Sequence, residues 1–469
     1  MTLLDEKTES MGENNHHEHA GELFKQERWE DAVSAYRQAI DSDPDVYWSH
    51  YHLGQSLSKL KRWEEAVSAY QHGLQISPTE VWAHYHLGQA LSELQRWEEA
   101  ITAYRMAIDI DDGKFWSHYH LGQALSELRR WEEAATAYRQ AIQIDPGKFW
   151  SHYHLGRALS ELKHWEEAAT SYRFAIQINS GEFWAHYHLG HALLELRRWE
   201  EAVTAYRQAV EINAGLFWPH FELGQALVEL ERWEEAAEAC QQAIQIESDK
   251  FWPYFRLGQA LIELERWDEA VVSLRQASSI DPTAFWPLYK QGRALSELRR
   301  WDEAAIAYQS AIDLKSDWYL TFCNLAQVLE HLGRSQEAIT SYRAGISLEP
   351  ENPDCRERLG RLFLTLGRLP EAAEVYGQLI SMIDSAELLV TLADALTEIG
   401  EADIAIPAYC RAMEIDSGIP LIYNRLGAVL EQVDRADDAL MIYKQAVAIH
   451  VGDEETHQRL ENLQIEMSG

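Results

Sequence analysis

The sequence predicts an all-α fold, a solenoid of stacked helical hairpins, and three observations support this fold class. Tryptophan occurs 18 times in 469 residues, and two series of these tryptophans recur at a constant spacing of 34 residues. Apolar residues within each 34-residue unit follow the three- and four-residue spacing of an α-helix. A short turn segment divides each unit into two halves. Regular self-similarity of this length is the sequence signature of a repeat architecture.

The unit at residues 115–148 shows why each element is expected. In its first half Leu121 and Leu125 lie at helical spacing, and in its second half Ala134 and Tyr138 do the same. An Arg-Arg-Trp segment separates the halves, and Pro146 ends the second helix because proline cannot continue one. The unit is therefore expected to be a helical hairpin.

The hairpin is expected to be closely packed, because Gly122 and Ala134 are small at the positions where the two helices meet. A single hairpin leaves one apolar face uncovered, and stacking against its neighbours covers that face. We therefore expect one continuous array.

The unit resembles the tetratricopeptide repeat (TPR) family. The matching residues are Leu121-Gly122, Ala134, Tyr138, Ala141 and Pro146. The resemblance implies a right-handed α-solenoid superhelix of helix-turn-helix hairpins whose first helices face the concave side. It also implies a role in binding other proteins.

The resemblance extends over almost the whole chain, as thirteen repeats. Residues 1–12 are expected to be a flexible acidic and polar N-terminus, and residues 13–318 to form the near-identical, Trp-rich repeats 1–9. Divergent repeats 10–13 follow at 319–453, and a C-terminal capping helix at 454–469.

Charge and hydropathy argue against two classes of partner. The net charge is −35, with 41 basic and 76 acidic residues, which disfavours nucleic acid and anionic membrane surfaces. No apolar run approaches the roughly 20 residues that span a bilayer, so no membrane insertion is expected. The first residues lack the features of a signal peptide. These features predict a cytoplasmic protein.

The cysteines are scattered without CxxC spacing, which predicts reduced thiols and neither a disulfide framework nor a zinc site. They are Cys240, Cys323, Cys355 and Cys410.

The candidate binding residues lie on one face of the first helices. Residues three and four apart on a helix share a face, so that from Trp116 this face continues through Tyr119 or His120 to Gln123. Stacked repeats turn these positions into ladders of aromatic and neutral polar groups. The groove-binding candidates are Trp82, Tyr85, His86, Gln89, Trp116, Tyr119, His120, Gln123, Trp150, Tyr153, His154, Arg157, Trp184, Tyr187, His188, His191, Trp218 and Gln225.

The two tryptophan series are interpreted differently. The series from Trp48 to Trp286 stands at the groove-facing helix, and it either binds a ligand or fills the seams between hairpins. The series from Trp29 to Trp301 begins each second helix and is expected to be core packing. Phe115 and Trp116 are adjacent and cannot point the same way, so one of each such pair is expected to be structural.

The histidines do not predict a metal site. One repeat position holds His50 to His220 and a second holds His52 to His188. Residues two apart on a helix do not face each other, and equivalent residues of stacked helices are roughly 8–10 Å apart. Zinc needs ligands at about 2 Å. His16, His17 and His19 are expected to lie in a flexible segment and to bind a metal only weakly.

A pH response is the alternative role for the second set of histidines. If the five groove histidines gain charge below about pH 6.5, ligand affinity should change between pH 5 and 7.5.

Paired carboxylates such as Glu132-Glu133 are expected to be structural, since they open the second helix, where acidic side chains favour the helix dipole. The preceding Arg129-Arg130 pair is expected in the turn, where it offsets nearby acidic residues and offers an edge stripe to acidic partners. The sequence has no GxxxxGK[ST], HExxH or GxSxG motif. No catalysis, cofactor or metal is predicted.

These observations predict a non-enzymatic scaffold that binds a protein or an extended peptide in the concave groove. Two alternatives remain open. The aromatic ladder suits a glycan, and the array resembles those linked to glycosyltransferase systems. A regular array also suits an architectural spacer, alone or self-associating, with no groove ligand.

Overall fold

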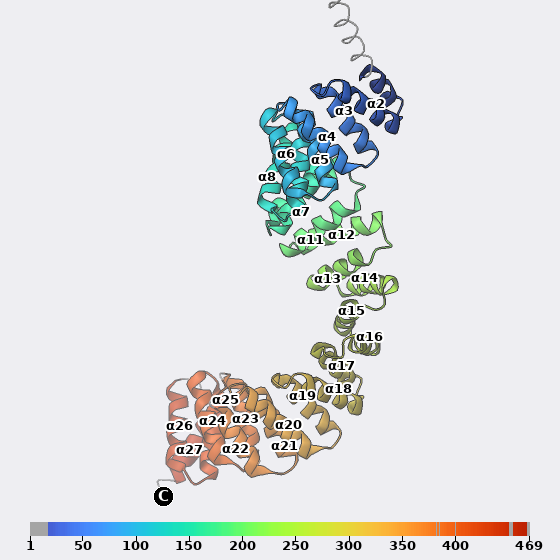
Figure 1. Cartoon of the computed structure of the whole chain (residues 1–469). Coiled ribbons are helices and arrows are strands. Elements are labelled where there is room, and N and C mark those ends of the chain that lie inside the picture. Colours follow the sequence, from blue (N-terminus) through green and yellow to red (C-terminus); the bar gives the residue numbers. More distant parts are fainter. Residues whose placement is uncertain (1–16, 381, 384, 399, 450–453, 467–469) are drawn as a thin grey trace, which may run out of the picture. The chain divides into compact units, whose positions relative to one another are not determined.

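The computed structural model describes residues 17–380, 382–383, 385–398, 400–449 and 454–466. Most of these residues are α-helical, and none of them forms a strand. The predicted flexible N-terminus at 1–12, and His16, lie outside the described residues. The predicted all-α stack of helical hairpins is confirmed (Figure 1).

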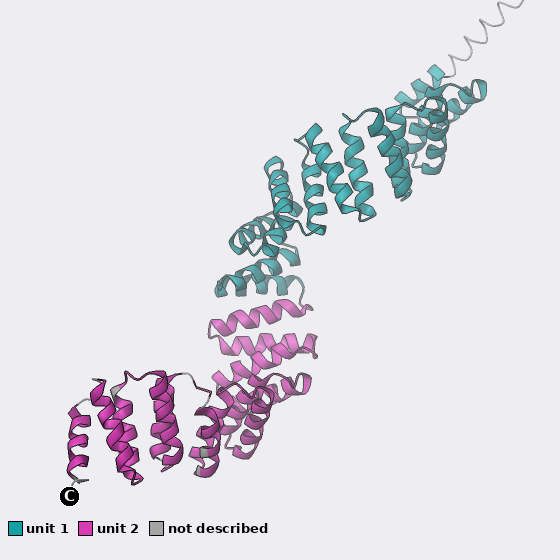
Figure 2. Ribbon diagram, turned by 90° about the vertical axis from the view of Figure 1, so that its left-hand side faces the viewer, with its two compact units in different colours: residues 1–247 teal, residues 248–469 magenta. Residues whose placement is uncertain are grey.

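The chain divides into two compact units, residues 1–247 and 248–469 (Figure 2). In unit 1 a helix over residues 17–25 precedes the labelled helices. These are α2 (Trp29–Ser42), α3 (Tyr47–Lys59), α4 (Trp63–Ile76), α5 (Val81–Glu93), α6 (Trp97–Ile110), α7 (Phe115–Glu127), α8 (Trp131–Ile144), α9 (Phe149–Glu161), α10 (Trp165–Ile178), α11 (Phe183–Glu195), α12 (Trp199–Ile212), α13 (Phe217–Glu229) and α14 (Trp233–Ile246).

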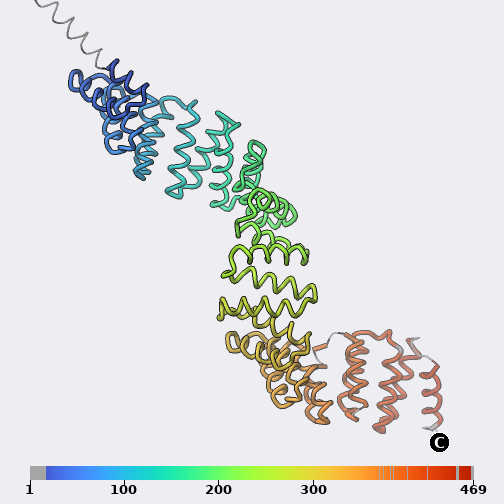
Figure 3. Tube along the Cα trace, turned by 90° about the vertical axis from the view of Figure 1, so that its right-hand side faces the viewer, coloured from blue at the N-terminus to red at the C-terminus, as the bar shows by residue number. Residues whose placement is uncertain are grey.

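Unit 2 continues the same alternation. It contains α15 (Phe251–Glu263), α16 (Trp267–Ile280), α17 (Phe285–Glu297), α18 (Trp301–Leu314), α19 (Tyr319–His331), α20 (Ser335–Leu348), α21 (Asp354–Thr365), α22 (Leu369–Ile380), α23 (Ala386–Glu398), α24 (Ala402–Ile415), α25 (Pro420–Gln432), α26 (Ala436–Ala448) and α27 (Glu454–Glu466). Within each unit successive helices run side by side (Figure 3).

The close approach predicted within each hairpin is confirmed. A Cβ built on Gly122 in α7 would lie 2.7 Å from Cε1 of Tyr138 in α8, so the glycine makes room for the tyrosine ring. Ala134 and Tyr138 are almost fully buried. Helix α8 ends at Ile144, two residues before Pro146, as expected.

The turn inside each Trp-rich hairpin contains a residue in the left-handed conformation that is not glycine. Arg129 has φ 56° and Arg197 has φ 58°, and both side chains are exposed. In the divergent repeats Gly333, Gly367 and Gly400 adopt positive φ instead. Glycine adopts this conformation without the steric cost that other residues bear.

Ion pairs join the beginnings of successive second helices. Arg130, the residue before α8, pairs with Glu133 in the first turn of α8 at 2.7 Å and with Glu98 of α6 at 3.1 Å. Acidic residues open the first turn, as expected from the helix dipole, but the residue before the helix makes no side-chain capping bond. The guanidinium of Arg130 therefore already has two carboxylate partners within the chain, and Arg130 is not available to an acidic partner in the predicted edge stripe.

The prediction of reduced thiols is wrong for two of the four cysteines. Cys323 in α19 and Cys355 in α21 form a disulfide, with Cα atoms 5.7 Å apart. They are 32 residues apart, close to one repeat, and stacking brings the first helices of neighbouring hairpins together. Cys410 is an exposed thiol, and Cys240 is buried where other repeats have tyrosine.

Among the described residues, no helix combines the length and the apolar character needed to cross a membrane.

Candidate functional site

The tryptophan at the second position of each first helix is exposed. Its exposed fraction is 45–56% at Trp48, Trp82, Trp116, Trp150, Trp184, Trp218, Trp252 and Trp286. The series that begins the second helices, Trp29 to Trp301, is half-buried instead. A large apolar side chain exposed once per repeat forms a surface that packing within the chain does not explain. Phe115 stacks on Tyr119 and so takes the structural role of the adjacent pair.

Each exposed tryptophan of the His-containing repeats covers a histidine. The Trp116 and His120 rings lie 5.9 Å apart at 24°, and the other side of His120 faces Tyr104 of the preceding hairpin at 6.0 Å and 20°. The same arrangement places an imidazole between a tryptophan and a tyrosine at His52, His86, His154 and His188. This stack joins the exposed face to the buried core.

Glutamine fixes the imidazole in the early repeats. The Nδ1 of His120 lies 2.7 Å from Oε1 of Gln123, which must accept the bond, and the Gln123 amide donates to the Tyr119 hydroxyl at 3.1 Å. His86 and Gln89 repeat this geometry at 2.9 Å. In α9, the first helix of the repeat after Gln123, Arg157 takes the place of the glutamine, and its side chain is exposed.

The predicted pH range is wrong for His154 and His188, and the pKa of all five half-buried histidines of this position is lowered. Burial lowers the pKa of His52, His86 and His120. Burial, together with the nearby positive charge of Arg157, lowers the pKa of His154 and of His188 to about 4. The imidazoles of His154 and His188 therefore stay neutral from pH 5 to 7.5, the range in which a change of charge was expected.

The other histidine position is structural. The Nε2 of His118 donates to the carbonyl of Asp112 at 2.9 Å, and His152 bonds the carbonyl of Pro146 at 3.0 Å in the same way. Each ring ties a first helix to the turn before it. No group of His, Cys, Asp and Glu among the described residues is arranged to hold a metal ion. His17 lies in a helix and packs on Tyr36 and His52.

The predicted candidates all lie on α5, α7, α9, α11 and α13, but they differ in accessibility. Tyr85, Tyr119 and Tyr153 are only 6–8% exposed and offer little surface to a ligand. Tyr187, His191 and Gln225 are half-buried. A hollow between α5 and α7 brings together Gln89, His120 and Gln123.

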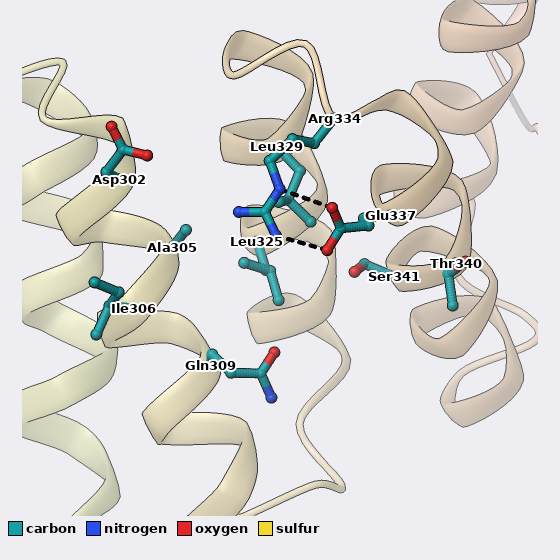
Figure 4. A pocket seen from close by; sticks show the side chains of 10 residues that line it. All are labelled: Asp302, Ala305, Ile306, Gln309, Leu325, Leu329, Arg334, Glu337, Thr340 and Ser341. Atoms are coloured by element: carbon teal, nitrogen blue, oxygen red, sulfur yellow. Dashed lines mark hydrogen bonds and ion pairs between the residues drawn. The ribbon is translucent and has the colours of Figure 1, made fainter.

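Hollows also occur on the side of the second helices. One of them, in unit 2, lies between α18 and α20 and over α19 (Figure 4). Its lining includes the apolar Ile306 and Leu329 and the ion pair of Arg334 and Glu337. A similar hollow in unit 1 lies between α6 and α8. Neither contains any of the predicted groove residues.

Sequence reasoning missed residues that interrupt the ladders. In α13 of unit 1, Glu222 takes the position at which the five preceding first helices have a histidine. In α11, Leu194 takes the position at which the four preceding first helices have a serine. In unit 2 the histidine position holds Arg256 and Lys290, and burial together with Arg293 lowers the pKa of Lys290. Aligning the repeats and reading each column for its exceptions would have found them.

Comparisons with known proteins give a consistent family. Family models described as the tetratricopeptide repeat match residues 45–113, 227–294, 288–314 and 323–383, and a model described as the TPR repeat matches 21–61, 125–163 and 190–231. No curated protein gives a significant match.

Solved structures match this chain at low sequence identity. The TPR protein YrrB, described as having an unusual peptide-binding site, is 22% identical over 40% of this chain and 96% of its own, with a TM-score of 0.38. MamA is 21% identical over 34% of this chain and 94% of its own, with a TM-score of 0.34. The Naa15/Naa10 complex bound to HypK-THB is 12% identical over 97% and 96% of the two chains, with a TM-score of 0.41.

Proposed function

Because this chain belongs to the tetratricopeptide repeat family, whose arrays are protein-interaction scaffolds, we propose that it binds an extended peptide on the first helices of unit 1. The contact surface is the row of exposed tryptophans from Trp82 to Trp218, with the histidines and glutamines beside them. The scaffold is non-catalytic.

The observation that carries this proposal is the contrast between the two tryptophan series. Both recur once per repeat, but only the first-helix series leaves about half of each indole side chain in water. Indole faces stack on apolar and planar groups, and the ring N–H offers a directed hydrogen bond. At Trp82, Trp116, Trp150 and Trp184 the Trp–His–Tyr stack holds the indole in place, so little entropy is lost when a ligand binds.

Aromatic platforms that recur at a helix-packing distance would suit a proline-rich peptide. Stacked helices lie roughly 8–10 Å apart. A polyproline II helix has three residues per turn and a rise of 3.1 Å, so the same face recurs about every 9 Å. Every third residue of such a peptide would meet the tryptophan of one repeat. This preformed conformation is a common ligand of aromatic-lined grooves.

The test is binding of proline-rich peptides to the full chain, measured by fluorescence anisotropy against composition-matched scrambled peptides. The triple variant Trp116→Ala, Trp150→Ala, Trp184→Ala should lose at least tenfold in affinity and keep its helical circular dichroism. Phe174→Ala is the matched control, since this aromatic side chain of α10 is as exposed as Trp150.

Other outcomes identify the alternatives. Binding of neutral oligosaccharides with the same dependence on tryptophan, and no binding of peptides, would replace the peptide by a glycan. Failure to bind either class would overturn the proposal and leave an architectural role.

A further inference from the structure

Tyr206 in α12 has a buried hydroxyl without a hydrogen-bond partner. In the four preceding repeats the equivalent hydroxyl meets a serine twelve residues earlier, as between Ser126 and Tyr138 at 3.3 Å and between Ser160 and Tyr172 at 3.1 Å. Leu194 occupies that serine position in this repeat. A buried hydroxyl that lacks a partner destabilises the folded state, because it has lost its hydrogen bonds to water.

In the two repeats that follow, the serine position and the tyrosine position change together. Where the serine becomes Val228, the tyrosine becomes Cys240, and where it becomes Ile262, the tyrosine becomes Leu274. Where it becomes glutamate, the tyrosine stays and bonds the carboxylate, as Tyr443 bonds Glu431 at 2.5 Å. Tyr36 after Phe24 and Tyr376 after Leu364 also keep the tyrosine without the serine, but among the described residues Tyr206 is the repeat tyrosine whose buried hydroxyl lacks a partner.

The residue that faces Tyr206 is also exceptional. In five repeats the residue sixteen positions after this tyrosine is a histidine stacked on it, as His188 is on Tyr172 at 5.8 Å. The residue sixteen positions after Tyr206 is Glu222. Glu222 therefore stands at the position that faces the tyrosine in the other repeats, and its negative charge contributes to the raised pKa of the Tyr206 hydroxyl.

The carboxyl of Glu222 has no cation to balance it among the described residues of unit 1. It is half-buried, and burial and the neighbouring Glu195 raise the pKa of Glu222 to about 7. Trp218 lies four residues earlier on α13, where the tryptophans of other repeats cover the imidazole, and its side chain is 56% exposed. With glutamate in place of histidine, no aromatic ring stands between Trp218 and Tyr206.

We propose that Glu222, Glu195 and the Tyr206 hydroxyl form a site for one cationic side chain of the bound peptide. An arginine or lysine there would pair with the two carboxylates, donate to the tyrosine oxygen, and lie against the exposed face of Trp218. Guanidinium groups combine planar stacking with several directed N–H donors, and suit this set of partners best. The inference rests on the proposed function, because the first-helix face must hold the peptide.

The experiment compares four proline-rich twelve-residue peptides that differ only at one central residue: arginine, lysine, citrulline or glutamate. Citrulline keeps the shape of arginine without the charge. Wild-type chain should bind the arginine peptide about tenfold more tightly than the citrulline peptide, with lysine between them and glutamate weakest.

Two variants restore the residues of the preceding repeats and are therefore expected to fold. Glu222→His should remove the preference for arginine over citrulline, and Leu194→Ser should reduce it by giving Tyr206 its usual partner. Glu161→Gln is the matched control, because Glu161 is the equivalent of Glu195 next to a satisfied tyrosine, and it should leave the preference unchanged.

Equal binding of the arginine and citrulline peptides, or a preference that survives in Glu222→His, would overturn this inference and leave the proposed peptide binding intact. Absence of binding of all four peptides to the folded chain would overturn the proposed function and the inference with it.

Discussion

The imidazole of His154 stacks on the phenol ring of Tyr138, with ring centroids 5.7 Å apart and planes at 18°. The two residues belong to neighbouring hairpins, and Trp150 covers the opposite side of the imidazole at 5.9 Å. The exposed face and the core are therefore one continuous aromatic stack. Trp150 at the surface and the contact between the two repeats therefore share the His154 ring.

The first prediction concerns acid stability. Burial keeps the pKa of His154 and of His188 at about 4, below the ordinary value of 6.5. In the unfolded chain these groups protonate near pH 6.5, so the unfolded state binds more protons and stability falls from there down to about pH 4. Each of them should cost about 2 kcal/mol at pH 5 relative to pH 7.5. Urea unfolding at the two pH values measures this loss.

The double variant His154→Phe, His188→Phe separates this effect from the titration of carboxylates. Phenylalanine keeps the ring between tryptophan and tyrosine and cannot be protonated. The variant should therefore lose less stability on acidification than the wild type. An equal loss in both proteins would show that the histidines are not the cause.

The second prediction is that Gly122→Ala destabilises unit 1 by about 1–3 kcal/mol. The added Cβ would meet the ring of Tyr138 at 2.7 Å, and a closely packed core accommodates extra volume only by shifting. Gly147→Ala is the control, since its nearest contact is the end of the Asp145 side chain at 3.4 Å. Thermal unfolding followed by circular dichroism should show a lower midpoint for the first variant alone.

Gly122 also shows how much of the fold could be predicted from the sequence. The helices, their turns and the close approach of Gly122 to the second helix follow from local spacing and from the period. The placement of the tryptophans on the first helices likewise follows from helical periodicity. These features depend on short-range rules that every repeat obeys.

The rest depends on contacts between repeats. That His154 is sandwiched, and therefore neutral, requires Tyr138 of the preceding hairpin, sixteen residues away. The disulfide between Cys323 and Cys355 depends on the stacking of α19 and α21. The two cysteines are 32 residues apart, so no short motif such as CxxC predicts the bond. The role of Glu222 becomes visible only when Tyr206 is known to face it without a partner.

The third prediction is that the disulfide stabilises unit 2. Closing a loop of this length limits the unfolded chain and is worth about 2–4 kcal/mol. Reducing agent should lower the unfolding midpoint of the wild type and leave that of the Cys323→Ser, Cys355→Ser variant unchanged. Thiol titration under denaturing conditions should detect two thiols in the untreated chain and four thiols after reduction. Four thiols without reduction would contradict the prediction.

The last prediction uses two tryptophans of one repeat, Trp150 and Trp165. Trp165 begins α10, is half-buried, and meets the ring of His191 in the next hairpin at 5.8 Å. Trp165→Ala should therefore lower the unfolding free energy by about 3 kcal/mol. Trp150→Ala removes a side chain that is already 51% exposed, and it should cost about 1 kcal/mol through the lost stack on His154. Peptide affinity should show the reverse order, with the larger loss in Trp150→Ala. If Trp150→Ala were as destabilising as Trp165→Ala and bound peptide normally, both tryptophan series would serve packing, and the ligand would have to lie elsewhere.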